Sequence, residues 1–210
     1  MSGNWPATVA NRAFFEIVLG QRACRDFTGA AVSEDDLGVM LEAATRAPSA
    51  HNSQPWEFVV VQDGDVRHGI ADIARGVWGA GRAALEQKLD ARLFADVDQF
   101  LHERDFGDAP VLVVVGVDTT KVHEAMIGCS IYPATQNLML AAAALGYGST
   151  FTNLTFQQNL AMAELLDLPD RIGVAGVIAI GQPRRALGPG RRDPWATRTH
   201  RDRFENPWTR

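Results

Sequence analysis

The stretch from Pro110 to Val117 (PVLVVVGV) limits the fold more than any other part of the chain. Its branched apolar residues occupy both faces of an extended strand, so neither face is suited to contact with water. A strand of this kind belongs in the middle of a sheet whose two faces are both covered. We therefore expect residues 110–117 to form a central strand.

Other patterns place further strands and helices around it. Residues 57–62 (EFVVVQ) and 174–180 are rich in branched residues and predict buried strands, and residues 148–154 (GSTFTNL) predict a short extended piece. Apolar residues at helical spacing predict helices over 11–19, 33–47, 134–145 and 156–166, with amphipathic helical sequence over 65–106. A chain of 210 residues suits one sizeable α/β core, so we predict a single domain over residues 1–210.

Helix ends carry their own signals. Ser33 and Asp36 form an S-x-x-[DE] capping pattern, and Pro48 stops the helix that follows. Pro133 either lies in a first helical turn or marks a kink, while Gly146 ends that helix. Ser33 thus predicts a helix start, and Pro48 and Gly146 predict two helix ends.

Two segments remain ambiguous. Residues 65–106 form either a variable wall or lid over a substrate pocket, or a plain helical hairpin on the surface. Residues 184–210 form an irregular, arginine-rich tail in which Trp195, Phe204 and Trp208 require a packing surface. That surface belongs either to a partner subunit or to the tail's own domain.

Composition excludes several classes of function. The net charge of -5 gives no reason to expect nucleic acid as a partner. Two cysteines provide no disulfide framework, and the five histidines have no metal-ligand spacing, so we expect no metal. No secretory signal and no apolar run of about 18 residues is present, which predicts a cytoplasmic protein without membrane segments.

Motifs for protein-based catalysis are also missing. We find no G-x-S-x-G, no H-E-x-x-H, no P-loop and no G-x-G-x-x-G. The sequence therefore predicts no catalytic side chain, and a bound cofactor would have to carry the chemistry.

Three polar stretches could hold such a cofactor. Arg22 and Arg25, predicted to lie on a turn between helices, could grip a phosphate, although solvated surface arginines explain the pair as well. The loop PSAHNSQP, which starts at Pro48, supplies hydroxyl and amide groups between two apolar elements. Arg191 and Arg192 form the third stretch, which is a solvated basic tail unless it meets the first in space.

Taken together, these stretches resemble the nitroreductase family, whose members bind flavin mononucleotide (FMN). The resemblance covers nearly the whole chain: QRACRDF, APSAHNSQPWEFVVV, DFGDAPVLVVVGVD, SIYPATQNLMLAAAALGYGSTFTNL, IGQP and the Arg-Arg-x-Pro tail. The APS-x-x-N-x-Q-P-W string is its specific element. The resemblance implies an α+β fold, an α-β-α sandwich with a mostly antiparallel central sheet, in an intertwined homodimer.

The resemblance also implies which residues bind FMN. The residues implied are Arg22, Ala23, Cys24, Arg25, Pro48, Ser49, Ala50, Asn52, Gln54, Thr152, Asn153, Leu154, Arg191 and Arg192. Residues 48–50 would reach the flavin from the second subunit, and residues 152–154 would bring backbone near the reactive ring nitrogen. Tyr132 and Phe151 are candidates for the substrate pocket, with a core position as the alternative for Tyr132.

Family members take a hydride from NADH or NADPH onto the flavin and reduce a small acceptor such as a nitroaromatic or a quinone. The chain departs from the common family pattern at Gln21 and Ala23, where Arg-x-Ser is frequent, and at Asn153, where an acidic residue is frequent. Other activities on the same scaffold remain open: flavin consumption, reductive dehalogenation, or flavin storage without turnover.

Overall fold

The computed structural model describes residues 12–103, 106–156 and 158–208. Asn11, the expected start of the first helix, lies outside these ranges, as do 104–105, 157 and the last two residues of the tail. The helices are α1 (Arg12–Gly20), α2 (Glu34–Thr45), α3 (Gly64–Lys88), α4 (Ala91–His102), α5 (Ile127–Ala144) and α6 (Asn159–Leu166). The strands are β1 (Trp56–Val61), β2 (Val111–Asp118), β3 (Gly148–Thr152) and β4 (Ile172–Gly181).

The four strands form one sheet in the order β1-β2-β4-β3, and every neighbouring pair is antiparallel. β2 lies between β1 and β4, and each of its residues is buried. The expectation of a central strand with two covered faces is therefore confirmed. The side chains of Val113 and Val115 pack into one core cluster and those of Leu112 and Val114 into the other.

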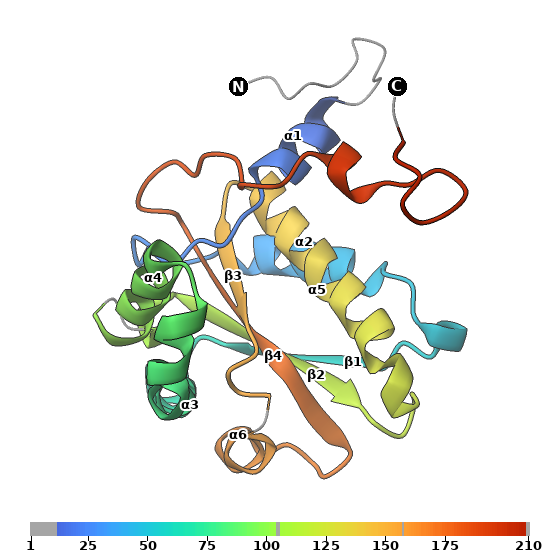
Figure 1. Ribbon diagram of the computed structural model, residues 1–210. Helices are drawn as coiled ribbons and strands as arrows, with labels where there is room; N and C mark the ends of the chain where they lie inside the picture. The colour runs from blue at the N-terminus through green and yellow to red at the C-terminus, as the bar shows by residue number, and fades with distance from the viewer. Residues whose placement is uncertain (1–11, 104–105, 157, 209–210) are drawn as a thin grey trace.

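Helices cover both faces of the sheet, as Figure 1 shows. α2 and α5 pack on one face through Met40, Ile131 and Leu138, and α3, α4 and α6 share the core on the other face. This arrangement confirms the α-β-α sandwich. A register shift opposite the step from Val115 to Gly116 leaves Ala175 as an extra residue in β4, so that its side chains change face at that point.

The predicted helix ends are largely correct. The backbone N–H of Asp36 donates to Ser33 Oγ at 3.1 Å, which caps α2 as expected. Gly146 follows α5 with a φ of +87°, a conformation that suits glycine. Pro133 lies inside α5, which begins at Ile127, so the first-turn alternative is wrong.

The tail has little regular structure beyond a short 3-10 turn over Trp195–Arg198. Phe204 is 80% exposed, and Trp195 and Trp208 are each about half exposed. These side chains lie outside the core of the described chain, and packing of the tail on a partner subunit stays a prediction. Among the described residues, no helix has the length and apolar character that crossing a membrane requires.

One polar cluster holds the hairpin of α3 and α4 together. Asp98 accepts hydrogen bonds from Trp78 Nε1 at 2.8 Å and from Arg82 Nε at 2.9 Å and Nη2 at 3.0 Å. These bonds, first those from Arg82, lower the pKa of Asp98 to about 2. A lowered pKa stabilises the folded state above the unfolded value of about 4, and this contribution is lost as the pH falls from about 4 toward 2.

Asp98→Asn is therefore expected to lower the free energy of unfolding by about 1–2 kcal/mol at pH 7, measured by urea denaturation. The difference from the unmodified chain should shrink at pH 2–3, where Asp98 becomes protonated. Glu86→Gln is the matched control, because Glu86 lies 3.9 Å from the same arginine on the exposed helix surface. It should change stability by no more than about 0.5 kcal/mol.

Candidate functional site

The segment of residues 21–28 is held in an extended conformation at the edge of the sheet. The N–H of Cys24 donates to the Ser149 carbonyl oxygen at 2.9 Å, and the N–H of Thr28 donates to that of Gln182 at 2.9 Å. The segment thus connects the start of β3 with the end of β4, rather than forming the expected turn. Ala23 is exposed beside Ser149, while Cys24 is buried, and burial raises the pKa of its thiol.

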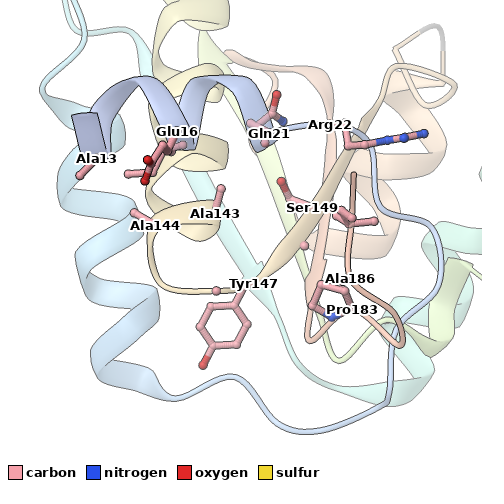
Figure 2. A pocket seen from close by; sticks show the side chains of 15 residues that line it. Ala13, Glu16, Gln21, Arg22, Ala143, Ala144, Tyr147, Ser149, Pro183 and Ala186 are labelled. Atoms are coloured by element: carbon pink, nitrogen blue, oxygen red, sulfur yellow. The ribbon is translucent and has the colours of Figure 1, made fainter. Parts of the chain in front are cut away.

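Arg22 lines a cavity of about 570 Å³ that we call the α1–α5 cavity. It is bounded by Ala13, Glu16, Ile17, Gly20, Gln21, Arg22, Ala143, Ala144, Gly146, Tyr147, Gly148, Ser149, Pro183, Ala186 and Leu187. Figure 2 shows Glu16 and Arg22 at opposite sides of it. Arg22 forms no ion pair with a carboxylate of the described residues, so its charge is available to an anion.

Arg25 lines a different cavity, of about 380 Å³, together with Asp26 and Arg184. Its Nη1 lies 2.7 Å from Oδ2 of Asp96 on α4, and only 18% of the Arg25 side chain is exposed. In an extended segment, side chains three positions apart project to opposite sides. The structure therefore does not bring Arg22 and Arg25 together, and a joint grip on one phosphate remains a prediction.

Arg191 and Arg192 follow Leu187, which lines the α1–α5 cavity, by four and five residues. Arg192 Nη1 donates to the carbonyl oxygen of Arg191 at 2.7 Å. Across the described residues, no hydrogen bond or ion pair joins either arginine to Arg22 or Arg25. Their role toward a phosphate also remains a prediction.

The polar loop over residues 48–54 is rigid and mostly exposed. His51, Asn52 and Gln54 have φ values of +53°, +53° and +46°, in the left-handed region, which Asn and His adopt more often than other non-glycine residues. Several hydrogen bonds support this conformation. The N–H of Ala50 donates to Ser130 Oγ at 3.1 Å, the N–H of Gln54 to Ser49 Oγ at 3.0 Å, and Gln54 Nε2 to Asn52 Oδ1 at 3.2 Å. Pro48 is exposed, and so are both amide side chains.

The end of β3 carries the second group of expected residues. The N–H of Leu154 donates to Thr152 Oγ1 at 3.3 Å, and Asn153 between them is exposed. The Phe151 ring packs edge-on against the ring of Tyr132 on α5, with centroids 6.0 Å apart. Tyr132 is 47% exposed, so the alternative of a core tyrosine is wrong.

Within one chain these groups lie far apart. The loop precedes β1, whereas Thr152 ends β3, and the sheet order places β1 and β3 at opposite edges, about 14 Å apart at roughly 4.8 Å per strand spacing. Ser130, which contacts the loop, and Ala143, which lines the α1–α5 cavity, are separated by about 20 Å along α5. Within one chain, the loop and the end of β3 therefore lie at opposite edges of the sheet, and a loop that reaches the ligand from a second chain stays a prediction.

The residues expected to bind FMN near β3 are spread along the strand. Ser149 lies at the α1–α5 cavity, and Thr152 lies about 10 Å farther along the strand. An elongated ligand lying along β3 would place an anionic end at Arg22 and Gln21 and a planar end beside Leu154. Gly148, which has no Cβ, leaves room for the side chain of Cys24 against β3.

Sequence reasoning missed several residues that the structure places here. Ser149, Gly148 and Leu187 contribute to the α1–α5 cavity, and Asp96 contacts Arg25. Gly146 and Gly148, on either side of Tyr147, could have predicted that another segment packs closely against the chain here. Asp96 carries no local signal, because it is one of many charges on an amphipathic helix.

Comparison with known proteins identifies what the chain is similar to. The pattern of the Nitroreductase family matches residues 18–182. An NADH dehydrogenase of Thermus thermophilus is 29% identical over 185 residues, covering 84% of this chain and 89% of that protein. A 5,6-dimethylbenzimidazole synthase of Rhodospirillum rubrum is 29% identical over 174 residues, covering 78% of this chain and 79% of that protein. A Desulfovibrio desulfuricans protein described as a nitroreductase, solved in complex with FMN, superposes with a TM-score of 0.70 at 26% identity, over 91% of this chain and 97% of its own.

Proposed function

Because the chain belongs to the nitroreductase family, we propose that it passes a hydride from NADH or NADPH, through bound FMN, to a small acceptor such as a nitroaromatic or a quinone. The family membership makes it a flavin oxidoreductase. The proposal that FMN is the bound cofactor rests on the two ends of β3. Arg22, which forms no ion pair with a carboxylate of the described residues, lies near one end, and an exposed backbone turn lies at the other.

Bound FMN would supply the hydride chemistry, and the protein would supply position and electrostatics. Arg22 would hold the phosphate at the α1–α5 cavity, and Arg191 or Arg192 would add charge from the tail. The turn over Thr152–Leu154 would bring its backbone near the reactive edge of the ring. Tyr132 and Phe151 would border the space left for substrate.

The polar loop would act on the flavin of a second copy of the chain. Its fixed conformation keeps Ser49, Asn52 and Gln54 oriented before any ligand arrives, which lowers the entropy cost of binding. Exposed apolar side chains are available to bury in such a dimer: Phe14 and Val18 on α1, Tyr132 on α5, and Trp195, Phe204 and Trp208 in the tail. The proposed site therefore contains residues of both subunits.

The proposal is tested by the absorbance spectrum of the purified protein and its change on anaerobic addition of each nicotinamide. We expect about one FMN per chain, bleached by NADH or NADPH and restored by a nitroaromatic or a quinone. Bound flavin that neither nicotinamide bleaches would refute the proposed reaction and favour flavin storage.

A second reading has a specific observation behind it. The similarity to the dimethylbenzimidazole synthase covers more than three quarters of both chains. Loss of the flavin under air with an external reductant, rather than its reoxidation, would favour flavin consumption over transfer to an acceptor.

A further inference from the structure

The polar loop is joined to α5 through one buried hydroxyl. Ser130, in the first turn of α5, is fully buried, and its Oγ accepts a hydrogen bond from the N–H of Ala50 at 3.1 Å. The two residues are 80 positions apart in the chain. Among the described residues, no other hydrogen bond joins residues 48–54 to α5. The hydrogen-bonded link between the loop and the helix therefore depends on Ser130.

The hydroxyl of Ser130 is oriented to accept this bond. It donates its own proton to the carbonyl oxygen of Met126, four positions earlier, at 3.0 Å. A serine hydroxyl has one proton to donate and two lone pairs, so a lone pair is left for the N–H of Ala50. Donation to Met126 fixes the rotation of the hydroxyl, and with it the direction from which the oxygen accepts.

Ser130 supplies a cap that the loop itself lacks. Residues Ala50–Asn52 form a short 3-10 turn, and the N–H groups at the start of such a turn have no partner within it. Ser49, at the position that usually caps the turn, makes no side-chain cap bond. Its Oγ accepts from the N–H of Gln54 instead, at 3.0 Å. Ser130 therefore caps the turn from another element, and this turn carries Asn52 and leads into Gln54.

We propose that Ser130 is a positioning residue, which holds Asn52 and Gln54 in the orientation that binds the flavin by fixing Ala50. The inference rests on the proposed function, in which the loop contacts the flavin of a second copy and the phosphate lies at Arg22. Loss of the hydroxyl leaves the N–H of Ala50 without its acceptor and gives the turn more freedom. The flavin must then order the loop as it binds, which weakens binding.

The test compares FMN with riboflavin, which has the same ring and ribityl chain but no phosphate. Dissociation constants are measured by flavin fluorescence for the cofactor-free chain and for Ser130→Ala. Because the phosphate is bound away from the loop, we expect Ser130→Ala to bind both flavins about tenfold more weakly. Arg22→Glu should instead weaken the binding of FMN alone, since riboflavin has no phosphate to repel.

Hydrogen exchange without flavin gives a second measurement, which reports on the loop directly. In Ser130→Ala the backbone of residues 49–54 should exchange faster, because the turn has lost its cap, while exchange in β1 should stay the same. A purely structural role of Ser130 in the core would instead raise exchange throughout the chain.

Thr135→Val is the matched control. Thr135 is buried on the same helix, and its Oγ1 donates to the carbonyl oxygen of Ile131 at 3.1 Å, again four positions earlier, but no described residue of the loop bonds to it. This variant should leave both dissociation constants and the exchange of the loop unchanged.

Several results would overturn the inference. Ser130→Ala might leave the exchange of the loop or the affinity for flavin unaltered, weaken the binding of FMN alone, or speed exchange throughout the chain; each of these outcomes contradicts a positioning role. An unmodified chain that binds no FMN would refute the proposed function instead.

Discussion

Gly148→Ala is expected to release bound FMN and to destabilise the fold by about 2 kcal/mol. A Cβ at position 148 would lie 2.6 Å from Cys24 Sγ and 2.7 Å from Cys24 Cβ, closer than real Cβ contacts allow. Since Cys24 is buried and its backbone is bonded to Ser149, the segment carrying Arg22 would have to move away from β3. The loss of FMN should reach at least about tenfold in the dissociation constant.

The measurements are urea denaturation for stability and flavin fluorescence for FMN binding. Gly79→Ala is the matched control, since no atom lies within 4 Å of a Cβ at that position in α3. Alanine there should stabilise the chain by up to about 1 kcal/mol, because it favours the helix, and should leave FMN binding unchanged. Unaltered FMN affinity in Gly148→Ala would show that the contact between the segment and β3 does not support the site.

Local patterns predicted the elements of this fold well. The two-sided apolar run of β2, the Ser33 cap and the glycine after α5 each depend on neighbouring residues, so they can be read from a short window of sequence. Family resemblance supplied the sandwich architecture. The extra residue at Ala175 and the placing of Pro133 inside α5 could not be read locally, because the packing of the whole sheet and helix decides them.

The site was harder to predict than the fold. Arg22 and Arg25 are close in sequence, and a turn would have let them converge. Pairing of the segment with β3 and β4 makes it extended instead and directs the two side chains into different cavities. The Arg25–Asp96 pair depends on how the α3–α4 hairpin packs on the sheet, which no spacing in the sequence encodes.

Sheet order raises a sharper question about the polar loop. APS-x-x-N-x-Q-P-W predicts that the loop is part of a flavin site, yet the loop precedes one edge of the sheet and β3 forms the other. If both groups contact the same FMN, we expect them to come from different chains. Two inactive variants, one altered in each group, should then regain activity when they form a mixed dimer.

Arg22→Glu would repel the phosphate, and Asn52→Val would remove an amide while placing a branched residue at a φ of +53°. Each variant alone is expected to lose about 100-fold in nicotinamide-dependent activity. The two variants are co-expressed with different tags. Random pairing makes half of the dimers mixed, and each mixed dimer has two sites, one of which is intact. About a quarter of the unmodified activity should therefore return.

Pairing two variants from the same group distinguishes true complementation from a nonspecific gain. Asn52→Val with Gln54→Val alters only the loop, so every site in the mixed dimer keeps a defective loop and no activity should return. The purified mixed dimer of Arg22→Glu and Asn52→Val should also bind half as much FMN as the unmodified dimer. If it were as inactive as its parents, each loop would serve its own chain, and the two edges of the sheet would have to be bridged by another arrangement.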